Sequence, residues 1–195
     1  MKIIKTKLFK SLLVSFIIGI IIGLICFILL SSNDKISLSN DLTNYINLIQ
    51  EGNFKYLSSL IKSFINNYKY LVLIWIFGIV FFCSLLIPFI IVYRGILLGF
   101  TISSIIYVFH IKGILYTLIM LIPSSIIIEF ILILISYYSI TFATKSFNAI
   151  KKDKTINLRH FIKNYFYIFL VLSFITLLSS VYEIYIGSNI IKFVV

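Results

Sequence analysis

The feature that most limits the fold is an almost continuously apolar stretch of about 75 residues, from Tyr70 to Thr144. An apolar helix needs about 20 residues to cross the hydrocarbon core of a bilayer, so this stretch has room for nearly three spans. Of all 195 residues, 61% are hydrophobic and 12% are charged, which is too little charge to cover a water-facing surface. The sequence therefore predicts an all-α, polytopic integral membrane helix bundle.

Five membrane spans are expected, and the breaks between them are marked by polar or helix-breaking residues. Within the long apolar stretch these are the group Tyr93-Arg94-Gly95 and the group His110-Ile111-Lys112-Gly113. Pro123 lies inside the longest span and allows a broken or re-entrant arrangement there. The predicted spans cover residues 11–30, 70–92, 95–110, 113–143 and 164–186.

Residues 31–69 form the only sizeable polar segment on their side of the membrane. Apolar residues recur in it at helical spacing over residues 42–49 and again over residues 57–68. Two short amphipathic helices cannot bury a core alone, so we expect them to lie on lipid headgroups, on the bundle or on a partner. The second stripe supplies the candidate docking residues Leu57, Leu60, Ile61 and Phe64.

The distribution of charge predicts the orientation of the chain in the membrane. Residues 145–163 form a basic connector that holds six Lys or Arg residues and a single acid, Asp153. With the N-terminus inside, this connector, the N-terminal lysines and Arg94 place eleven of the 17 basic residues on the cytoplasmic side. The positive-inside rule therefore favours an N-terminus inside and a C-terminus outside, with residues 31–69 outside the cytoplasm.

The net charge of +11 would suggest a nucleic-acid ligand if it formed a soluble basic face, but here the excess flanks apolar runs. In that position basic residues orient helices and attract anionic lipid, by about 1 kcal/mol per charge near the surface. Membrane lipid is therefore the expected partner, and nucleic acid is not.

Glu129 and Glu183 are the only two of the six acidic residues that fall within predicted spans. A lone charge at the centre of a membrane helix costs about 2.5–3.5 kcal/mol on insertion scales, so such residues are retained for a reason. One interpretation is a proton or ion site of a small transporter or channel component, with Arg94 as a partner if the fold brings them together. The other is a protonated or hydrogen-bonded carboxyl that holds helices together.

Two Gly-x-x-x-Gly faces, Gly19 with Gly23 and Gly95 with Gly99, would let helix backbones approach closely in lipid. Two such faces among five spans favour packing within the chain over dimerisation.

Signatures of enzymes, metal sites and cofactor sites are absent from the sequence. His110 and His160 lie in different connectors, and neither a His-x-x-x-His nor a Cys-x-x-Cys pattern occurs. The serine elbow Gly-x-Ser-x-Gly and the phosphate-binding loop are also missing. The sequence thus predicts a protein that is not an enzyme and that holds no metal or cofactor.

A series of short motifs resembles the stage II sporulation protein M family, and together the motifs cover nearly the whole chain. In order they are Gly19-x-x-x-Gly23, Tyr68-Lys69-Tyr70-Leu71, Ile74-Trp75-Ile76-Phe77-Gly78, the run from Arg94 to Thr101, Leu121-Ile122-Pro123, and the run from Val181 to Ile186.

The resemblance implies a multi-pass protein of the bacterial cell membrane that acts in the mother cell, at the septal membrane that engulfs the forespore. It implies a non-enzymatic scaffold that anchors or localises cell-wall hydrolases similar to stage II sporulation proteins D and P, for peptidoglycan remodelling. Gly95, Gly99, Pro123 and Glu183 match family positions. Glu129 comes one residue later than the glutamate of the wider family, so no family role carries over to it.

Overall fold

The computed structural model describes residues 6–51, 54–151 and 158–189. Nearly all of these residues are helical and none is in a strand, which confirms the predicted all-α membrane bundle. In chain order the elements are α1 (Thr6–Ile28), α2 (Ser32–Gln50), α3 (Tyr56–Ile79), η1 (Cys83–Leu86), α4 (Ile87–Tyr116), η2 (Thr117–Leu121), α5 (Ile122–Lys151), α6 (Leu158–Val181) and η3 (Tyr182–Gly187).

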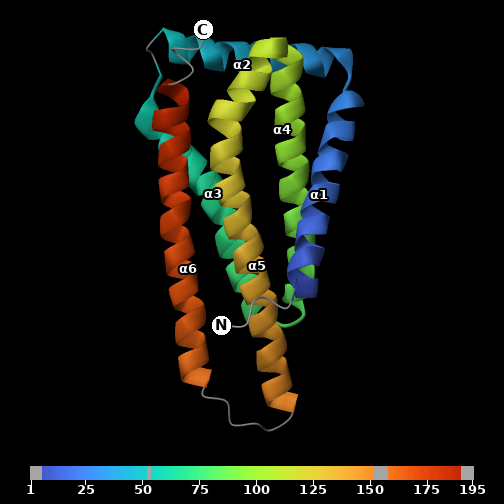
Figure 1. The fold of residues 1–195 in the computed structure, drawn as a ribbon, viewed down its shortest axis with the longest axis vertical. Helices are drawn as coiled ribbons and strands as arrows, with labels where there is room; N and C mark the ends of the chain where they lie inside the picture. The colour runs from blue at the N-terminus through green and yellow to red at the C-terminus, as the bar shows by residue number, and fades with distance from the viewer. Residues whose placement is uncertain (1–5, 52–53, 152–157, 190–195) are drawn as a thin grey trace.

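The long helices α1, α3, α4, α5 and α6 run along the bundle, and α2 lies across one end of it (Figure 1). We call this end the α2 end. The helix α1 begins at the opposite end, whereas η3 finishes at the α2 end, where Ile184 packs with Ile46 and Ile49 of α2. The described chain therefore starts and finishes at opposite ends of the bundle.

Four stretches of the described residues are long and apolar enough, by length and composition, to cross a membrane. They are Lys7–Ile28, Cys83–Ile119, Ile122–Ala149 and Ile162–Gly187. The helix α3 runs beside them, but it carries two lysines and two asparagines between residues 62 and 69, which lower its apolar content. Large aliphatic and aromatic side chains are exposed on the outside of the bundle, as expected for a surface in contact with lipid.

The predicted break at Tyr93-Arg94-Gly95 is wrong. The chain turns at residues 80–86 instead, between α3 and α4, where Val80 has extended backbone angles (φ −100°, ψ 117°). Pro88 follows in the first turn of α4. The N–H groups of a first turn have no acceptor within the helix, so the missing N–H of proline costs no hydrogen bond there. Arg94 consequently lies inside a helix, and the predicted boundary between residues 92 and 95 is replaced by continuous α4.

This correction also changes the charge count, because Arg94 is buried in the bundle and does not belong to a cytoplasmic loop. The basic ends of the connector between α5 and α6 still lie at the end of the bundle where α1 begins (Figure 1). The expectation of a cytoplasmic N-terminus therefore depends on the N-terminal lysines and on the connector alone.

The second predicted amphipathic helix is not a separate surface element. Residues 56–79 form the single helix α3, so the stripe over residues 57–68 is its first half, and the predicted start of a span at residue 70 lies within it. The first stripe forms α2, which packs on the bundle through the buried side chains of Ile46 and Ile49.

The chain reverses direction at His110, within the predicted break over residues 110–113. His110 has φ 50° and ψ −121°, so the rising limb of α4 ends there and the chain returns from Ile111. A Cβ atom on Gly113 would lie 2.4 Å from the carbonyl oxygen of Ile105. Glycine at this position therefore lets the two limbs of the hairpin pack closely.

The helix does not break at Pro123. The π-helical turn η2 continues directly into α5, and the Ile122 N–H donates to the carbonyl of Thr117. Pro123 has no N–H to donate to the carbonyl of Ile119, and the Tyr182 hydroxyl lies 3.5 Å from that oxygen. The Tyr182 side chain of η3 therefore lies beside the carbonyl group that Pro123 leaves without its helical hydrogen bond.

The two glycine faces lie against each other between α1 and α4, which run side by side (Figure 1). A Cβ atom on Gly19 would lie 2.3 Å from the Val92 carbonyl oxygen, and one on Gly95 would lie 2.4 Å from that of Phe16. Gly23 and Gly99 are equally crowded by backbone. Glycine is required at all four positions for the two backbones to approach this closely.

Candidate functional site

Arg94 of α4 and Glu129 of α5 form a buried ion pair inside the bundle. Arg94 donates hydrogen bonds from Nε and Nη2 to Oε1 of Glu129, over 3.0 and 2.7 Å. The two residues are only 8% and 4% exposed, so neither charge is hydrated as it would be at a surface. The sequence predicted a pair between Arg94 and Glu129 only if the fold brought them together, and the fold does so. Their attraction offsets the cost of burying each charge.

The helix α3 completes the surroundings of the guanidinium group. Asn67 accepts a hydrogen bond from Arg94 Nη2 over 3.1 Å. The ring of Tyr70 lies 4.8 Å from Arg94 Cζ and 5.0 Å from Lys69 Nζ, within the range of cation–π attraction. The charged centre of the bundle thus joins three helices.

The ion pair lies near the middle of the membrane-spanning part of the bundle. Gly95, the neighbour of Arg94, contacts Gly19, which is close to the middle of the 23-residue α1. A helix of that length is about 35 Å long, slightly more than a hydrocarbon core. Charges at this depth are typical of functional sites in membrane proteins.

Glu183 faces the same part of α3 as the Arg94–Glu129 pair, but it lies nearer the α2 end than the pair does. It accepts a hydrogen bond over 2.7 Å from Ser63, which precedes Asn67 by one turn of α3, or about 6 Å. Glu183 belongs to η3, a π-helical segment, and such turns are frequent at functional sites. Glu129 and Glu183 therefore bind different partners at neighbouring levels.

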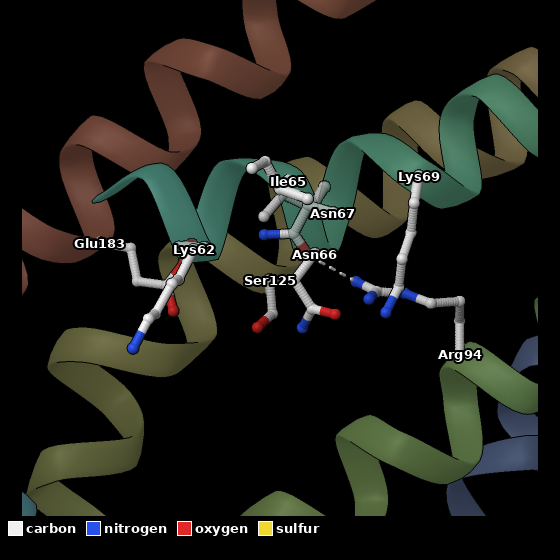
Figure 2. Close-up of a pocket in the computed structure, with 10 residues that line it drawn as sticks. Lys62, Ile65, Asn66, Asn67, Lys69, Arg94, Ser125 and Glu183 are labelled. Atoms are coloured by element: carbon white, nitrogen blue, oxygen red, sulfur yellow. Dashed lines mark hydrogen bonds between the residues drawn. The ribbon is translucent and has the colours of Figure 1, made fainter. Parts of the chain in front are cut away.

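An open cavity of about 550 Å³ adjoins Arg94 and Glu183 and is lined by residues of α3, α4, α5 and η3. Figure 2 shows Arg94 and Glu183 on opposite sides of it, with Asn66 and Ser125 between them. A second cavity of about 210 Å³ shares Arg94 and Ser125 with the first and reaches Glu129. A charged cavity of this size within a membrane bundle is a candidate ligand site.

The predicted docking residues divide into two pairs. Leu57 and Ile61 are 68% and 48% exposed. Leu60 packs against the cluster of Ile46 and Ile49, and Phe64 stacks on Tyr68 with ring centroids 5.0 Å apart. Only Leu57 and Ile61 are therefore free to contact another molecule without disturbing the packing of this chain.

Several residues of the cavity were not predicted from the sequence. Lys62, Asn66 and Lys69 follow one another at intervals of four and three residues, which puts them on one face of a helix. This polar stripe opposite the apolar stripe of residues 57–68 was the signal that could have identified them. Ser63 and Ser125 carry no comparable signal, because their position in the cavity depends on contacts between distant parts of the chain.

A family model described as Stage II sporulation protein M matches residues 12–188, from the first turns of α1 to the end of η3. No curated protein and no solved structure shows a significant match. The matched range includes both glycine faces, the Arg94–Glu129 pair, Pro123 and Glu183. The chain therefore belongs to the stage II sporulation protein M family, and it is a sporulation-associated membrane protein.

Proposed function

We propose that this protein is a non-enzymatic membrane scaffold that anchors or localises peptidoglycan-degrading partners during septal wall thinning and forespore engulfment. The family match over residues 12–188 is the observation that carries the proposal. The proposed partners are hydrolases similar to stage II sporulation proteins D and P, and the proposed location is the engulfing septal membrane of the mother cell.

The outer side of α2 is the surface best suited to such a partner. The inner side of this helix is tied to the bundle by Ile46 and Ile49, so the helix is held in place across the end of the bundle. The charge distribution favours an orientation in which this end faces the wall compartment. We define the α2 docking face by its exposed polar residues Asp34, Asn40, Asp41 and Asn44.

Leu57 and Ile61, near the start of α3, add two exposed apolar side chains close in sequence to the end of α2. Polar groups around a few exposed apolar side chains are typical of protein interfaces that form and dissociate. A partner that binds here would meet the polar face of α2 and the two apolar side chains together.

Deletion of the gene, followed by membrane-dye microscopy during sporulation, tests the scaffold role. We expect arrest at a flat or bulging septum, because hydrolases that are not recruited leave the septal wall intact. Unaffected engulfment in the deletion strain would defeat the proposal.

Substitutions on the α2 docking face test the proposed surface. Asn44→Lys, and separately Leu57→Asp with Ile61→Asp, should prevent recruitment of fluorescently tagged hydrolases to the septum while the protein still inserts. The matched control for Asn44→Lys is Asn148→Lys, which adds the same single charge at an exposed position at the other end of the bundle. Normal recruitment by stably inserted variants would exclude this face.

A second candidate function, a small transporter or channel component, is favoured by the cavity that reaches the ion pair at mid-depth. Transporter sites often lie near the bilayer midplane, where helices are irregular, and both η2 and η3 border this region. The purified protein in vesicles should then carry a pH-dependent flux that Glu183→Gln removes. If wild-type vesicles carry no flux, this candidate fails.

A further inference from the structure

The outer face of α3 carries a line of exposed side chains at heptad spacing. Lys62, Asn66, Lys69, Leu73 and Ile76 follow one another at alternating intervals of four and three residues, and all five are exposed. This is the spacing by which one helix packs along another, with an average period of 3.5 residues. The first three residues of the line are polar and the last two are apolar. We call these five residues the α3 seam.

Two open spaces between α3 and α4 continue one another along the seam. The cavity of about 550 Å³, which we call the polar cavity, adjoins Lys62, Asn66 and Lys69. An apolar groove of about 400 Å³ adjoins Lys69 and Leu73 and extends away from the α2 end as far as Leu86, at the beginning of α4. A lipid keeps its headgroup at one surface, so it does not match a space whose polar part reaches mid-depth. A helix that crosses the membrane passes along both spaces.

The polar half of the seam lies at a depth where lipid is a poor cover. Lys69 is level with Arg94, because both contact the ring of Tyr70. Lys62 lies seven residues earlier in α3, or about 10 Å nearer the α2 end. Figure 2 shows Lys62, Asn66 and Lys69 along α3, with Arg94 on a facing helix. A lysine at mid-depth is far from the headgroups of either surface, and its charge is costly there unless it is paired.

This chain offers the two lysines no suitable acid. Among the described residues the buried pair of Arg94 and Glu129 is the one ion pair, so Lys62 and Lys69 each lack a carboxylate there. Four of the six acidic residues belong to polar segments outside the predicted spans. Glu183 lines the polar cavity itself and accepts its hydrogen bond from a serine hydroxyl. A second copy of the chain would bring the same basic excess to this face, so the complementary charge has to come from another protein.

We propose that the α3 seam is a docking site for a membrane-spanning helix of a partner protein, and that this helix carries a carboxylate at mid-depth. The carboxylate pairs with Lys69, and a second acid two turns nearer the α2 end pairs with Lys62. Apolar side chains of the same helix fill the groove along Leu73 and Ile76. The inference rests on the proposed function, because it states how a recruited partner is held within the membrane, in addition to the α2 docking face.

Fluorescence energy transfer between the labelled full-length protein and a labelled synthetic helix tests the seam. Both are reconstituted in phosphatidylcholine vesicles, whose headgroups carry no net charge to compete for the lysines. The probes are two helices of about 23 Leu and Ala residues that differ only in a central Glu or Gln. We expect the Glu helix to bind about tenfold or more tightly than the Gln helix, because only Glu supplies a charge to Lys69.

The charge of the seam is tested by the double variant Lys62→Gln with Lys69→Gln, which should bind the two helices equally. Its matched control is Lys55→Gln with Lys112→Gln, which removes the same charge from exposed positions that line neither space. The control should keep the preference of the wild-type protein for the Glu helix.

The groove is tested by Leu73→Trp, which fills it and should weaken the binding of both helices. Leu170→Trp makes the same change at a 49% exposed position of α6 and should leave the binding unchanged. Thermal unfolding of each variant without a probe helix checks that it is folded.

Three results would overturn the proposal. Equal binding of the two helices by the wild-type protein would remove the argument from charge. An equal loss of preference in the seam variant and in its lysine control would indicate general attraction to a basic protein. Energy transfer between differently labelled copies of the protein alone, abolished by the seam variant, would assign the seam to a second copy.

The vesicle assay contains no hydrolase, so its outcome is separate from that of the gene deletion. Selective binding of the Glu helix together with unaffected engulfment would reject the scaffold role and keep the seam as a helix-binding site. Arrested engulfment together with equal binding of the two helices would keep the scaffold role and reject the seam.

Discussion

Arg94 directs two of its nitrogen atoms at one oxygen of Glu129, and among the described residues the other carboxylate oxygen has no hydrogen-bond partner. The pair therefore uses only half of the acceptor capacity of the carboxylate. The cavity of about 210 Å³ that reaches Glu129 can supply a further donor, such as water or a ligand group.

Removal of either partner should destabilise the protein strongly. Arg94→Met or Glu129→Leu alone leaves an unpaired charge in the bundle, and we expect a loss of about 3–5 kcal/mol in the free energy of unfolding. The double variant should be more stable than either single variant, because no lone charge remains. Thermal or denaturant unfolding in detergent measures the cycle, and additive losses would mean that the pair does not couple α4 to α5.

Replacement of the packing glycines should separate α1 from α4. Gly95→Ala would bring a methyl group to within 2.4 Å of the Phe16 carbonyl oxygen, which is backbone and cannot rotate away. We expect a loss of about 2 kcal/mol or more for this variant. Ile21→Ala, on the lipid-facing side of α1 with a 51% exposed side chain, is the control and should cost much less.

His110→Gly should stabilise the protein by about 1 kcal/mol, because φ 50° is a left-handed conformation that is costly for a residue with a side chain. His110→Ala keeps the Cβ atom and should bring no comparable gain. The two variants are compared by thermal unfolding. Equal stability of the two would show that the backbone at residue 110 is not strained.

Tyr45 of α2 should titrate late. Burial, reinforced by the negative charge of Glu183, raises the pKa of Tyr45 to about 12. The folded protein thus holds this proton more tightly than the unfolded chain, where the pKa is about 10. The resulting stability, about 2–3 kcal/mol, is complete below pH 10 and is lost as the pH rises from 10 to 12.

Tyr45→Phe should therefore reduce the loss of stability between pH 10 and 12. The difference between the ultraviolet absorbance titrations of the wild-type protein and of Tyr45→Phe isolates the ionisation of this phenol. A midpoint near pH 10 in that difference would contradict the burial of Tyr45 against the bundle.

The orientation in the membrane can be tested with reporter fusions. A reporter placed after Val195 should be active outside the cytoplasm, and one placed after Lys151, between α5 and α6, should be active inside. A cytoplasmic reporter after Val195 would overturn the expected five-span topology.

The membrane character, the reversal near His110 and the glycine pattern are all visible in the sequence, because each depends on local composition or spacing. The break at Arg94 was misplaced because an arginine inside an apolar run resembles the end of a span. What keeps Arg94 within α4 is Glu129, which is 35 residues away in the sequence. Local patterns contain no information about such a partner.

The polar cavity was missed for a related reason. The first half of α3 has the composition of a surface helix, and Lys62 and Asn66 resemble its solvated face. In the fold that face lines a cavity between helices, and Leu60 packs against the cluster beneath α2. An amphipathic stripe specifies two unlike faces, but it does not specify which of them is in contact with water.

The contact between α1 and α4 also has a consequence for biosynthesis. The main neighbour of α1 is a helix that the ribosome makes much later, after α2 and α3 have been completed. Until then the Gly19–Gly23 face of α1 is not packed against α4. The hydrophobicity of α1 alone keeps this helix in the bilayer. The α1–α4 contact can therefore form only when α4 has entered the membrane, and a nascent chain stopped before that point leaves the Gly19–Gly23 face of α1 unpacked.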